Sequence, residues 1–438
     1  MGCFFHCFLF MALCLSISEA ASDYHSLIAR SSAYEGYKVC TVRVSSDKDV
    51  RVLRNIEETF KDGFEMWSDY FQKGDVLIFH VKSDYIPIIR KILKTHSIRF
   101  QVHKDNVDQT IRGEVSNETD SRYDEFGYNY AKHNSFIAMF QLLKGLTDTY
   151  RRISRLETVG YTVERRPILA VHISKSRLTK KPAILIECGA HAREWSAFEA
   201  CLYFTSMLLK QKSEKVRRIT SLYDFVILPA LNPDGYVYAW TTDRMWRKNR
   251  ACYLPQDQCI DKCVGVDINR NFDVEFCQDS ISSKDPCSST FCGISAFSER
   301  ESLAMKKMVA RLKNRLLAYF CFHSFMGVWT YPWAKKRELP PNYREMARVA
   351  RVAVNTVQNI SNSVYRIGNI ARVIYSVTGS SVDYAYDSGQ AKYAYAIELR
   401  QGKEKTGFIM NEREILPLCR ETFAALVNSI LAMCPDRN

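Results

Sequence analysis

The chain has 438 residues, 47% of them hydrophobic and 25% charged, and a formal net charge of +13. The length allows a large core and more than one domain, and the composition excludes collagen-like, low-complexity and intrinsically disordered proteins. Up to Arg122 there are 16 basic and 17 acidic residues, so 45 of the 61 Lys and Arg and 31 of the 48 Asp and Glu follow it. A basic surface there could weakly bind polyanions such as sulfated glycans, although a solvated basic face is the simpler interpretation.

Residues 1–20 contain an apolar run with no acidic residue before Glu19, and the run ends in the small-x-small pattern of Ser18 to Ala20. This pattern predicts a cleaved secretory signal peptide, although its first residues lack the usual Lys or Arg. The alternative is a membrane anchor, but an apolar core of about fifteen residues is too short to span a bilayer comfortably. We therefore expect a secreted, extracellular protein with no membrane-spanning segment and no nucleic-acid partner.

Residues 21–122 are predicted to form a small α+β unit that ends in a linker. Alternating segments rich in Val and Ile predict strands, and apolar residues at helical spacing predict helices. The predicted strands are 37–44 and 75–81, and the predicted helices are 47–60 and 84–96. The polar, glycine-containing segment 110–127 contains Arg112 and Arg122, and a trypsin-like protease that cut after either one would free the rest of the chain.

Over residues 123–438, apolar strands alternate with helical segments. The predicted strands are 167–173, 182–188, 223–231, 317–323 and 393–399, and the predicted helices lie near 195–211, 298–315, 342–360 and 412–433. Continuously apolar strands separated by helices favour an α/β fold with a mixed central sheet covered by helices on both faces. Ligands of such sheets bind at the carboxyl ends of strands. The candidate groups at or near such ends are His191, Glu194, His323 and Glu398.

The stretch GAHAREW, Gly189 to Trp195, places a histidine and a glutamate three residues apart after a predicted buried strand. Imidazole nitrogen and carboxylate oxygen are good zinc ligands, and a catalytic zinc ion usually has three protein ligands and one open position. His191 and Glu194 could share one ion with His323 as the third ligand, or they could be ordinary surface residues. Standing alone, His323 would equally fit a semi-buried histidine without a metal.

A zinc hydrolase also needs a base for its water and groups that hold its substrate. Glu398 ends an apolar strand, where an acidic residue is costly to bury unless it has a task or a partner such as Arg400. Candidates for holding a substrate carboxylate are Arg244, Arg247, Asn269 and Arg270, which lie in DRMWRKNR and VGVDINRNFD. Because guanidinium groups suit carboxylates, such a site could hold a peptide by its free C-terminus and hydrolyse the last bond.

The chain resembles the zinc metallocarboxypeptidases of the pancreatic A/B type together with their activation propeptide. The resemblance covers essentially the whole chain after the signal peptide. It depends on the order and spacing of PAILIECGAHAREW, LNPDGY, RMWRKNR, CVGVDINRNFD, the HSF to YPW block at 323–333, VIYSVTGSSVDYAY and YAIELR. It implies a zymogen with a signal peptide over 1–20, a propeptide and connector over 21–122, and a catalytic domain over 123–438 with the mixed central sheet.

The resemblance also implies a role for each candidate residue. His191, Glu194 and His323 align with the ligands of one zinc ion, which lowers the pKa of its water to roughly 7. Glu398 aligns with the general base, and Arg247 aligns with the residue that stabilises the oxyanion. The residues aligned with substrate-binding positions are Arg193 in an outer subsite, Asn269 and Arg270 at the terminal carboxylate, and the mobile Tyr375.

One position deep in the specificity pocket separates the two subtypes, since an acidic residue there selects C-terminal Lys and Arg. By alignment this position is Val382, and the residues lining the same pocket are Ile370, Val377 and Ala396. A Lys side chain buried there would lose its hydration without gaining a partner, whereas an apolar side chain would gain from burial. We expect release of aromatic or aliphatic residues, unless a one-residue alignment shift brings Asp383 or Asp387 into the pocket.

Of the 15 cysteines, Cys3, Cys7 and Cys14 lie in the predicted signal peptide, and the others face an oxidising compartment where disulfides are the norm. The resemblance implies the pairs Cys188–Cys201, Cys263–Cys287 and Cys277–Cys292. Proximity along the chain suggests two more pairs, Cys252–Cys259 and Cys419–Cys434. Cys321 is expected to be a buried free thiol, and Cys40 to lie in the propeptide.

Two departures from the family pattern remove no ligand. Phe325 replaces a tyrosine after the second histidine, which removes a hydroxyl from an outer subsite, and Ser196 replaces an apolar residue beside the first metal motif. An inactive binding protein on the same fold is the main alternative, but such proteins usually lack a ligand or the base, and here each is present. A zinc endopeptidase would carry HExxH, which does not occur in this sequence.

Overall fold

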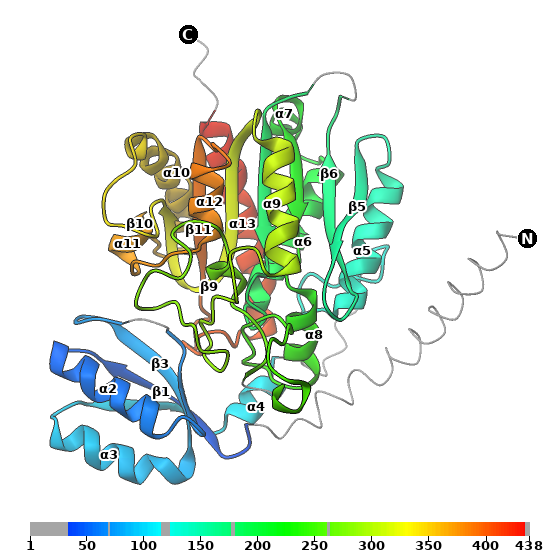
Figure 1. Cartoon of the computed structure of the whole chain (residues 1–438). Coiled ribbons are helices and arrows are strands. Elements are labelled where there is room, and N and C mark those ends of the chain that lie inside the picture. Colours follow the sequence, from blue (N-terminus) through cyan, green and yellow to red (C-terminus); the bar gives the residue numbers. More distant parts are fainter. Residues whose placement is uncertain (1–33, 69–70, 115–122, 177–179, 261–262, 434–438) are drawn as a thin grey trace, which may run out of the picture.

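The computed structural model describes residues 34–68, 71–114, 123–176, 180–260 and 263–433. The predicted signal peptide, Arg122 and Cys434 lie outside these residues. The described chain forms two separate sheets, a four-stranded sheet near the N-terminus and a seven-stranded sheet after residue 123 (Figure 1).

The first unit is a small α+β layer with strand order β2-β3-β1-β4. Its strands are β1 (Tyr37–Arg43), β2 (Phe64–Met66), β3 (Val76–Lys82) and β4 (Phe100–Lys104), and its helices are α2 (Asp47–Thr59), α3 (Ile86–Thr95) and α4 (Val107–Arg112). Ser46 begins α2 with a capping box, since its side chain accepts from the Asp49 amide and Asp49 accepts from the Ser46 amide. Helices α2 and α3 cover one face of the sheet, where Leu53 and Leu93 pack against Phe79.

The opposite face of this small sheet faces the second unit. Val39 and Ile78 point to that side because side chains alternate along a strand. They form one buried cluster with Trp67 of the first unit and with Met245 and Phe408 of the second. The two units are therefore joined by an apolar contact as well as by the polar contacts described below.

The large sheet has strand order β10-β9-β7-β8-β6-β5, and β11 pairs with β9. Its strands are β5 (Ser154–Tyr161), β6 (Pro167–Ile173), β7 (Ala183–Cys188), β8 (Asp224–Leu228), β9 (Leu316–Tyr331), β10 (Arg366–Asn369) and β11 (Tyr393–Arg400). The strands β7, β8 and β9 are parallel, whereas β6 is antiparallel to β8 and β5 to β6. All residues of β7 and β8 are buried, as expected for parallel strands covered on both faces.

Helices cover both faces of this sheet, which confirms the predicted α/β architecture. The helices are α5 (Phe136–Thr149), α6 (Trp195–Lys210), α7 (Glu214–Leu222), α8 (Pro233–Thr241), α9 (Arg300–Leu312), α10 (Tyr343–Ser361), α11 (Ile370–Val373), α12 (Ser381–Asp387) and α13 (Glu412–Ala432). Along β7, Ile184 and Ile186 pack into the core that includes residues of α5, α6, α10 and α13. Leu185 points to the other side, into the core that includes residues of α9 and α12.

Several predicted elements need correction. His323 does not end its strand, because β9 continues to Tyr331 and both Cys321–His323 and Val328–Thr330 lie opposite Ala396–Glu398 of β11. Segment 110–127 is not irregular at its start, since Arg112 ends α4 and pairs with Asp108 at 2.6 Å. The elements that pattern analysis missed are β2, β4, β5, β10, α4, α5, α7, α8, α11 and α12, many of them short or only half buried.

Helix α13 alone, among the described helices, has the length and apolar composition of a membrane span. No such segment was expected from the sequence after the signal peptide. Its buried face packs against α10, α6 and α7, and Ile415, Leu426 and Ile430 belong to the main core. These contacts are those of a core helix of the second unit.

Candidate metal centre and substrate pocket

The turn between β7 and α6 carries the first two candidate ligands. Gly189 begins this turn with φ of +71°, and a Cβ there would lie 2.3 Å from the Phe198 ring, so the close packing of turn on helix requires glycine. The disulfide between Cys188 and Cys201 joins the end of β7 to α6. Glu194 occupies the N-cap position of α6, and the turn therefore holds both ligands at the carboxyl end of a rigid strand.

His323 lies on β9, next to β7 in the sheet, and completes a group of three candidate ligands. His191 Nδ1 is 2.8 Å from Glu194 Oε1, His323 Nδ1 is 3.0 Å from Glu194 Oε2, and the two Nδ1 atoms are 3.2 Å apart. All three side chains are buried. Two imidazoles that turn the same nitrogen toward one carboxylate form the N, N, O donor set of a catalytic zinc site.

Asp267 orients this group from behind. Its Oδ1 lies 3.1 Å from His191 Nε2, the ring nitrogen that faces away from Glu194. Its Oδ2 accepts from Nη2 of Arg247 at 2.8 Å and from Nε at 3.1 Å. A carboxylate on the far nitrogen of a ligating histidine fixes the tautomer and the ring orientation. Asp267 therefore couples the candidate metal centre to Arg247.

The carboxylates of the centre are stabilised in their ionised form by their neighbours. Burial opposes ionisation of Asp267, but Arg247 and Arg270 outweigh it and hold the pKa of Asp267 well below its usual value. Burial also opposes ionisation of Glu194, and the charges of His191 and His323 hold its pKa below the usual range. Asp267 thus has two arginines beside it, which is the condition for burying its charge at tolerable cost.

A cavity of about 90 Å³ opens beside the three ligands. Its lining includes nine of the ten residues that the sequence analysis assigned to a site: His191, Glu194, Arg247, Asn269, Arg270, His323, Tyr375, Val382 and Glu398. Glu398 lies opposite His323 in the pairing of β11 with β9. The guanidinium of Arg400 is engaged by Glu414 at 2.9 Å and Glu421 at 2.8 Å, so the partner considered for Glu398 is held by other acidic residues.

Polar groups converge on one wall of this cavity. Arg270 Nη2 donates to the Tyr375 hydroxyl at 3.2 Å. The Asn269 side-chain carbonyl accepts from the Ser381 amide at 3.0 Å, and its amide nitrogen lies 3.4 Å from His323 Nε2. Asn269 and Arg270 are adjacent in one 3-10 turn, Ile268–Arg270, and Tyr375 comes from a separate segment. Together they give the wall donors that could hold a carboxylate.

The lining of the cavity also includes an apolar group whose members belong to one hydrophobic cluster. These residues are Ile370, Ile374, Val377, Val382 and Ala396. Asp383, the alternative acidic group, is buried and accepts from the Ala334 amide at 2.9 and 3.0 Å and from the Lys335 amide at 2.9 Å. Asp387 is exposed. The carboxylates among the described lining residues are Glu194 and Glu398.

Arg193, the tenth predicted residue, lies under the first unit instead of in the cavity wall. Its Nη1 donates to Glu65 of β2 at 2.7 Å, and its guanidinium stacks on Phe408 with 4.3 Å to the ring centroid. Trp67 and Ser68 of the first unit line the cavity itself. The first unit therefore covers the outer part of the cavity and neutralises one arginine at its rim.

Glu114, at the end of the first unit, makes the second polar contact between the units. It is buried, and its carboxylate accepts from Arg244 at 2.7 and 2.9 Å and from the Met410 amide at 2.8 Å. Arg244 also donates to the carbonyls of Arg193 and Phe408. Its guanidinium is thus occupied by these partners and does not face the cavity as a free carboxylate-binding group.

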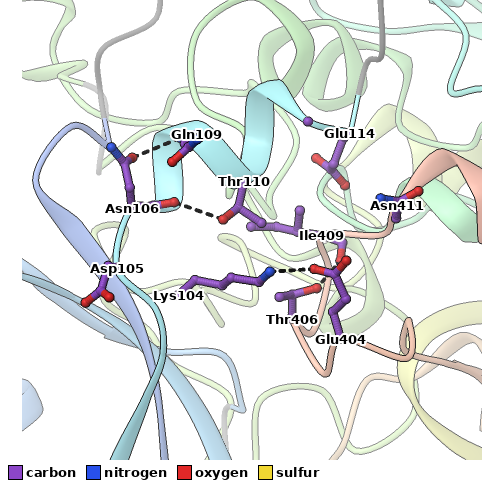
Figure 2. Close-up of a pocket in the computed structure, with 11 residues that line it drawn as sticks. Lys104, Asp105, Asn106, Gln109, Thr110, Glu114, Glu404, Thr406, Ile409 and Asn411 are labelled. Carbon is purple, nitrogen blue, oxygen red and sulfur yellow. Dashed lines mark hydrogen bonds and ion pairs between the residues drawn. The ribbon is translucent and has the colours of Figure 1, made fainter. Parts of the chain in front are cut away.

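A second, larger cavity of about 360 Å³ lies at this interface between α4 and the loop 404–411. Figure 2 shows Lys104 reaching across it to Glu404, a distance of 2.6 Å, with Glu114 beside Asn411. The buried Glu114 pair and the exposed Lys104–Glu404 pair therefore bridge the same interface in two different environments.

Four disulfides are present among the described residues: Cys188–Cys201, Cys252–Cys259, Cys263–Cys287 and Cys277–Cys292. The first, third and fourth are the pairs implied by the resemblance, and the second is one of the two inferred from proximity. Cys321 is a buried free thiol, as predicted, and Cys40 is buried in the first unit. Cys419 has no disulfide partner within the described residues, and its expected partner Cys434 lies outside them.

Asp267, Phe408 and Trp67 were not predicted from the sequence to belong to the site. Asp267 lies inside the quoted motif CVGVDINRNFD, and a buried acidic residue two positions before Asn269 was a usable signal. Trp67 and Phe408 reach the cavity from segments with no polar pattern of their own, so no local signal could have identified them.

Comparison with known proteins agrees with this geometry. The family model described as zinc carboxypeptidase matches residues 139–425, and the model described as carboxypeptidase activation peptide matches residues 40–114. The chain is 31% identical over 410 residues to mast cell carboxypeptidase A of Rattus norvegicus, covering 92% of this chain and 96% of the relative. It is also 31% identical over 410 residues to carboxypeptidase B of Bos taurus, covering 93% and 94% of the two chains.

Two solved structures share the whole architecture. The structure of thrombin activatable fibrinolysis inhibitor has a TM-score of 0.82 and 30% identity, and the alignment covers 91% of this chain and 98% of the other. The carboxypeptidase A of Helicoverpa armigera has a TM-score of 0.80 and 28% identity over the same shares. The chain therefore belongs to the zinc carboxypeptidase family and is a metallocarboxypeptidase zymogen with an N-terminal activation peptide.

Proposed function

We propose that this chain is a secreted, zinc-dependent carboxypeptidase zymogen that releases aromatic or aliphatic residues from peptide and protein C-termini. The relatives include both A-type and B-type enzymes at the same 31% identity, so the subtype has to be argued from the cavity. The observation that carries the proposal is a single cavity that is lined both by three potential metal-binding groups and by five apolar side chains.

His191, Glu194 and His323 are proposed to hold one zinc ion, because their donor atoms converge and Asp267 orients His191 as a ligating histidine requires. Zinc bound there would act as a Lewis acid on the scissile carbonyl and would acidify the attacking water. The remaining chemistry belongs to the side chains of the chain itself.

Glu398 is proposed as the general base, since it lies opposite His323 in the sheet and lines the same cavity. It would take the proton of the attacking water and pass it to the leaving amine. Arg247, held by Asp267, would stabilise the negative charge that develops on the carbonyl oxygen, a contribution of about 3–4 kcal/mol for one well-placed donor. Asn269, Arg270 and Tyr375 would bind the terminal carboxylate.

The apolar side chains in the lining of the cavity support a preference for Phe, Tyr, Leu or similar residues. Burying such a side chain against Val382 and its neighbours gains about 25 cal/mol per Å² of apolar surface. A Lys or Arg side chain would lose its hydration there, and Asp383 is engaged by two backbone amides instead of facing the cavity. A charge buried without a partner costs several kcal/mol.

Activation is proposed to require a trypsin-like protease that cuts in the connector, with Arg122 favoured over Arg112. Arg112 ends α4 and pairs with Asp108, and the buried Glu114 follows two residues later. A cut after Arg112 would leave Glu114 on the mature enzyme, whereas a cut after Arg122 would release Glu114 together with the first unit.

The proposal is tested with a peptide library that varies only the C-terminal residue, incubated with the purified zymogen before and after trypsin treatment. We expect release of single C-terminal residues only after trypsin, with apolar residues released first. Internal cleavage of the peptides, or no release by a cleaved and folded protein with bound zinc, would contradict the assignment to carboxypeptidase activity.

A further inference from the structure

The amino ends of the parallel strands carry a concentration of positive charge that the catalytic site does not use. Ala183, the first residue of β7, pairs with Asp224, the first residue of β8, and with Leu316, the first residue of β9. The segments leading into these strands therefore meet at one edge of the sheet. Ser154 pairs with Ile173, so the start of β5 and the end of β6 lie at that edge as well.

The basic residues of these segments define what we call the basic pole. They are Arg151, Arg152, Lys175, Lys180, Lys181, Lys212, Lys215, Arg217, Arg218, Lys313 and Arg315. All are exposed except Lys181 and Arg315, which are half-buried. The acidic groups in the same segments or at their strand starts are few. Glu214 is exposed on α7, and the buried Asp224 is paired with Arg315 at 2.6 Å and with Lys181 at 3.5 Å.

Contacts between the segments hold the pole together. Lys175 donates to the Arg217 carbonyl at 3.2 Å, Lys181 donates to the Thr220 carbonyl at 2.9 Å, and Arg315 donates to the Lys181 carbonyl at 2.9 Å. The backbone oxygens in these contacts carry no charge, and Lys181 and Arg315 share the single carboxylate of Asp224. Like charges held this close repel one another, so the arrangement stores a strong positive potential that an anionic partner would relieve.

The pole lies far from the chemistry. The six residues of β7 separate it from His191 and span roughly 20 Å, which is about twice the screening length of physiological salt. Figure 1 shows α7 at the end of the second unit opposite the first unit. A partner bound at the pole would leave the cavity and the activation connector accessible.

We propose that the basic pole docks a sulfated polysaccharide of the heparin type. The partner must be a polyanion, because eleven cations spread over four chain segments exceed what a single small anion can contact. A linear sulfated chain suits this spread, and it is a polyanion that a secreted protein meets. Single-stranded nucleic acid fits less well, since it is bound by exposed aromatic platforms, and the aromatic residues of these segments, Tyr150 and Tyr223, pack into the core. The choice of partner rests on the proposed secretion and not on the proposed catalysis.

The test compares two variants that lose the same charge. In the first, Lys212, Lys215, Arg217 and Arg218 of the pole are replaced by Gln, and in the second the exposed Arg51, Lys91, Lys94 and Arg99 of the first unit are replaced by Gln. Binding to heparin is measured by elution from a heparin column and by the dissociation constant at several salt concentrations. Dextran sulfate, fully desulfated heparin and a DNA duplex serve as comparison polyanions and controls.

We expect the wild-type zymogen to elute above physiological ionic strength, about 0.15 M, and to bind desulfated heparin at least tenfold more weakly. The pole variant should lose tenfold or more in affinity, with a shallower salt dependence, while the first-unit variant stays within twofold of wild type. Melting temperature and trypsin-activated peptidase activity should be unchanged in both variants. Equal losses in the two variants would show that net charge alone drives binding, and wild-type elution below physiological salt or equal binding of duplex DNA would overturn the proposal.

Discussion

The two edges of the same parallel strands handle charge in opposite ways. At the carboxyl edge, Glu194, Asp267 and Arg247 are buried, and each has a hydrogen-bonding partner within 3.1 Å, His191 for Glu194 and each other for Asp267 and Arg247. At the amino edge, cations such as Lys212 and Arg218 are exposed, and acidic residues are few. The same sheet thus carries a compact site with buried, partnered polar groups at its carboxyl edge and an exposed basic surface at its amino edge.

This difference separates two uses of charge. Burying an ion costs several kcal/mol unless a partner is placed beside it, so a buried network indicates chemistry that needs fixed positions. An exposed field costs little and acts at longer range, but salt screens it. Changes at the carboxyl edge should therefore alter turnover by orders of magnitude, whereas changes at the amino edge should alter association only.

The largest effect is expected from metal removal. Dialysis of the trypsin-activated enzyme against phenanthroline should abolish peptide hydrolysis. The metal ion proposed to bind at the three converging side chains acts as a Lewis acid, and neither Glu398 nor Arg247 can take over that role. Metal analysis should give one zinc per chain before dialysis, and added zinc should restore activity. The same treatment should leave heparin binding at the basic pole unchanged. Full activity in metal-free protein would contradict the assignment.

The next largest effect is expected from Glu398→Gln, which keeps the shape of the side chain and removes the proton acceptor. The kcat should fall by about three orders of magnitude or more, while zinc content stays at one per chain. The matched control is Glu275→Gln, since Glu275 pairs with Lys335 at 2.9 Å on a half-exposed surface. A Glu398→Gln enzyme within tenfold of wild type would rule out its role as the base.

A smaller effect is expected where the two units meet. Glu114→Ala leaves Arg244 buried without its carboxylate, which costs about 3–5 kcal/mol. The zymogen should then show measurable peptidase activity before trypsin treatment, and the first unit should be cut faster. Glu404→Gln is the control, because it breaks the exposed pair with Lys104 across the same interface and should cost at most about 1 kcal/mol. Equal behaviour of the two variants would show that burial of the Glu114 pair does not hold the first unit.

Much of the fold and the site was accessible from the sequence because the signals are local. Continuous apolar runs identified the buried strands β7 and β8, and helical spacing located α10 and α13 to within two residues. The half-buried β5 and the short β10 lack such a run and were missed. The extension of β9 beyond His323 depends on its pairing with β11, a long-range contact that no local pattern encodes.

The candidate site residues were predicted from motifs, whereas their surroundings could not be predicted from the sequence. The contacts of Arg193 and Arg244 could not be predicted from the sequence, because their partners lie in the first unit. Arg193 donates to Glu65, and Arg244 donates to Glu114. The alternatives for the specificity position were separable only in three dimensions, where Asp383 binds the amides of Ala334 and Lys335 and Val382 lines the cavity.

The most direct test of the account is the ratio of kcat/KM for two blocked substrates that differ only in ending with Phe or Arg. The trypsin-activated enzyme should prefer Phe by at least a hundredfold. An Arg side chain buried against Val382 would lack an acidic partner, and burying an unpaired charge costs several kcal/mol. Val382→Asp should move the ratio toward Arg, and Val382→Asn, which adds a polar group without charge, should not. A wild-type preference for Arg would contradict the account of the pocket.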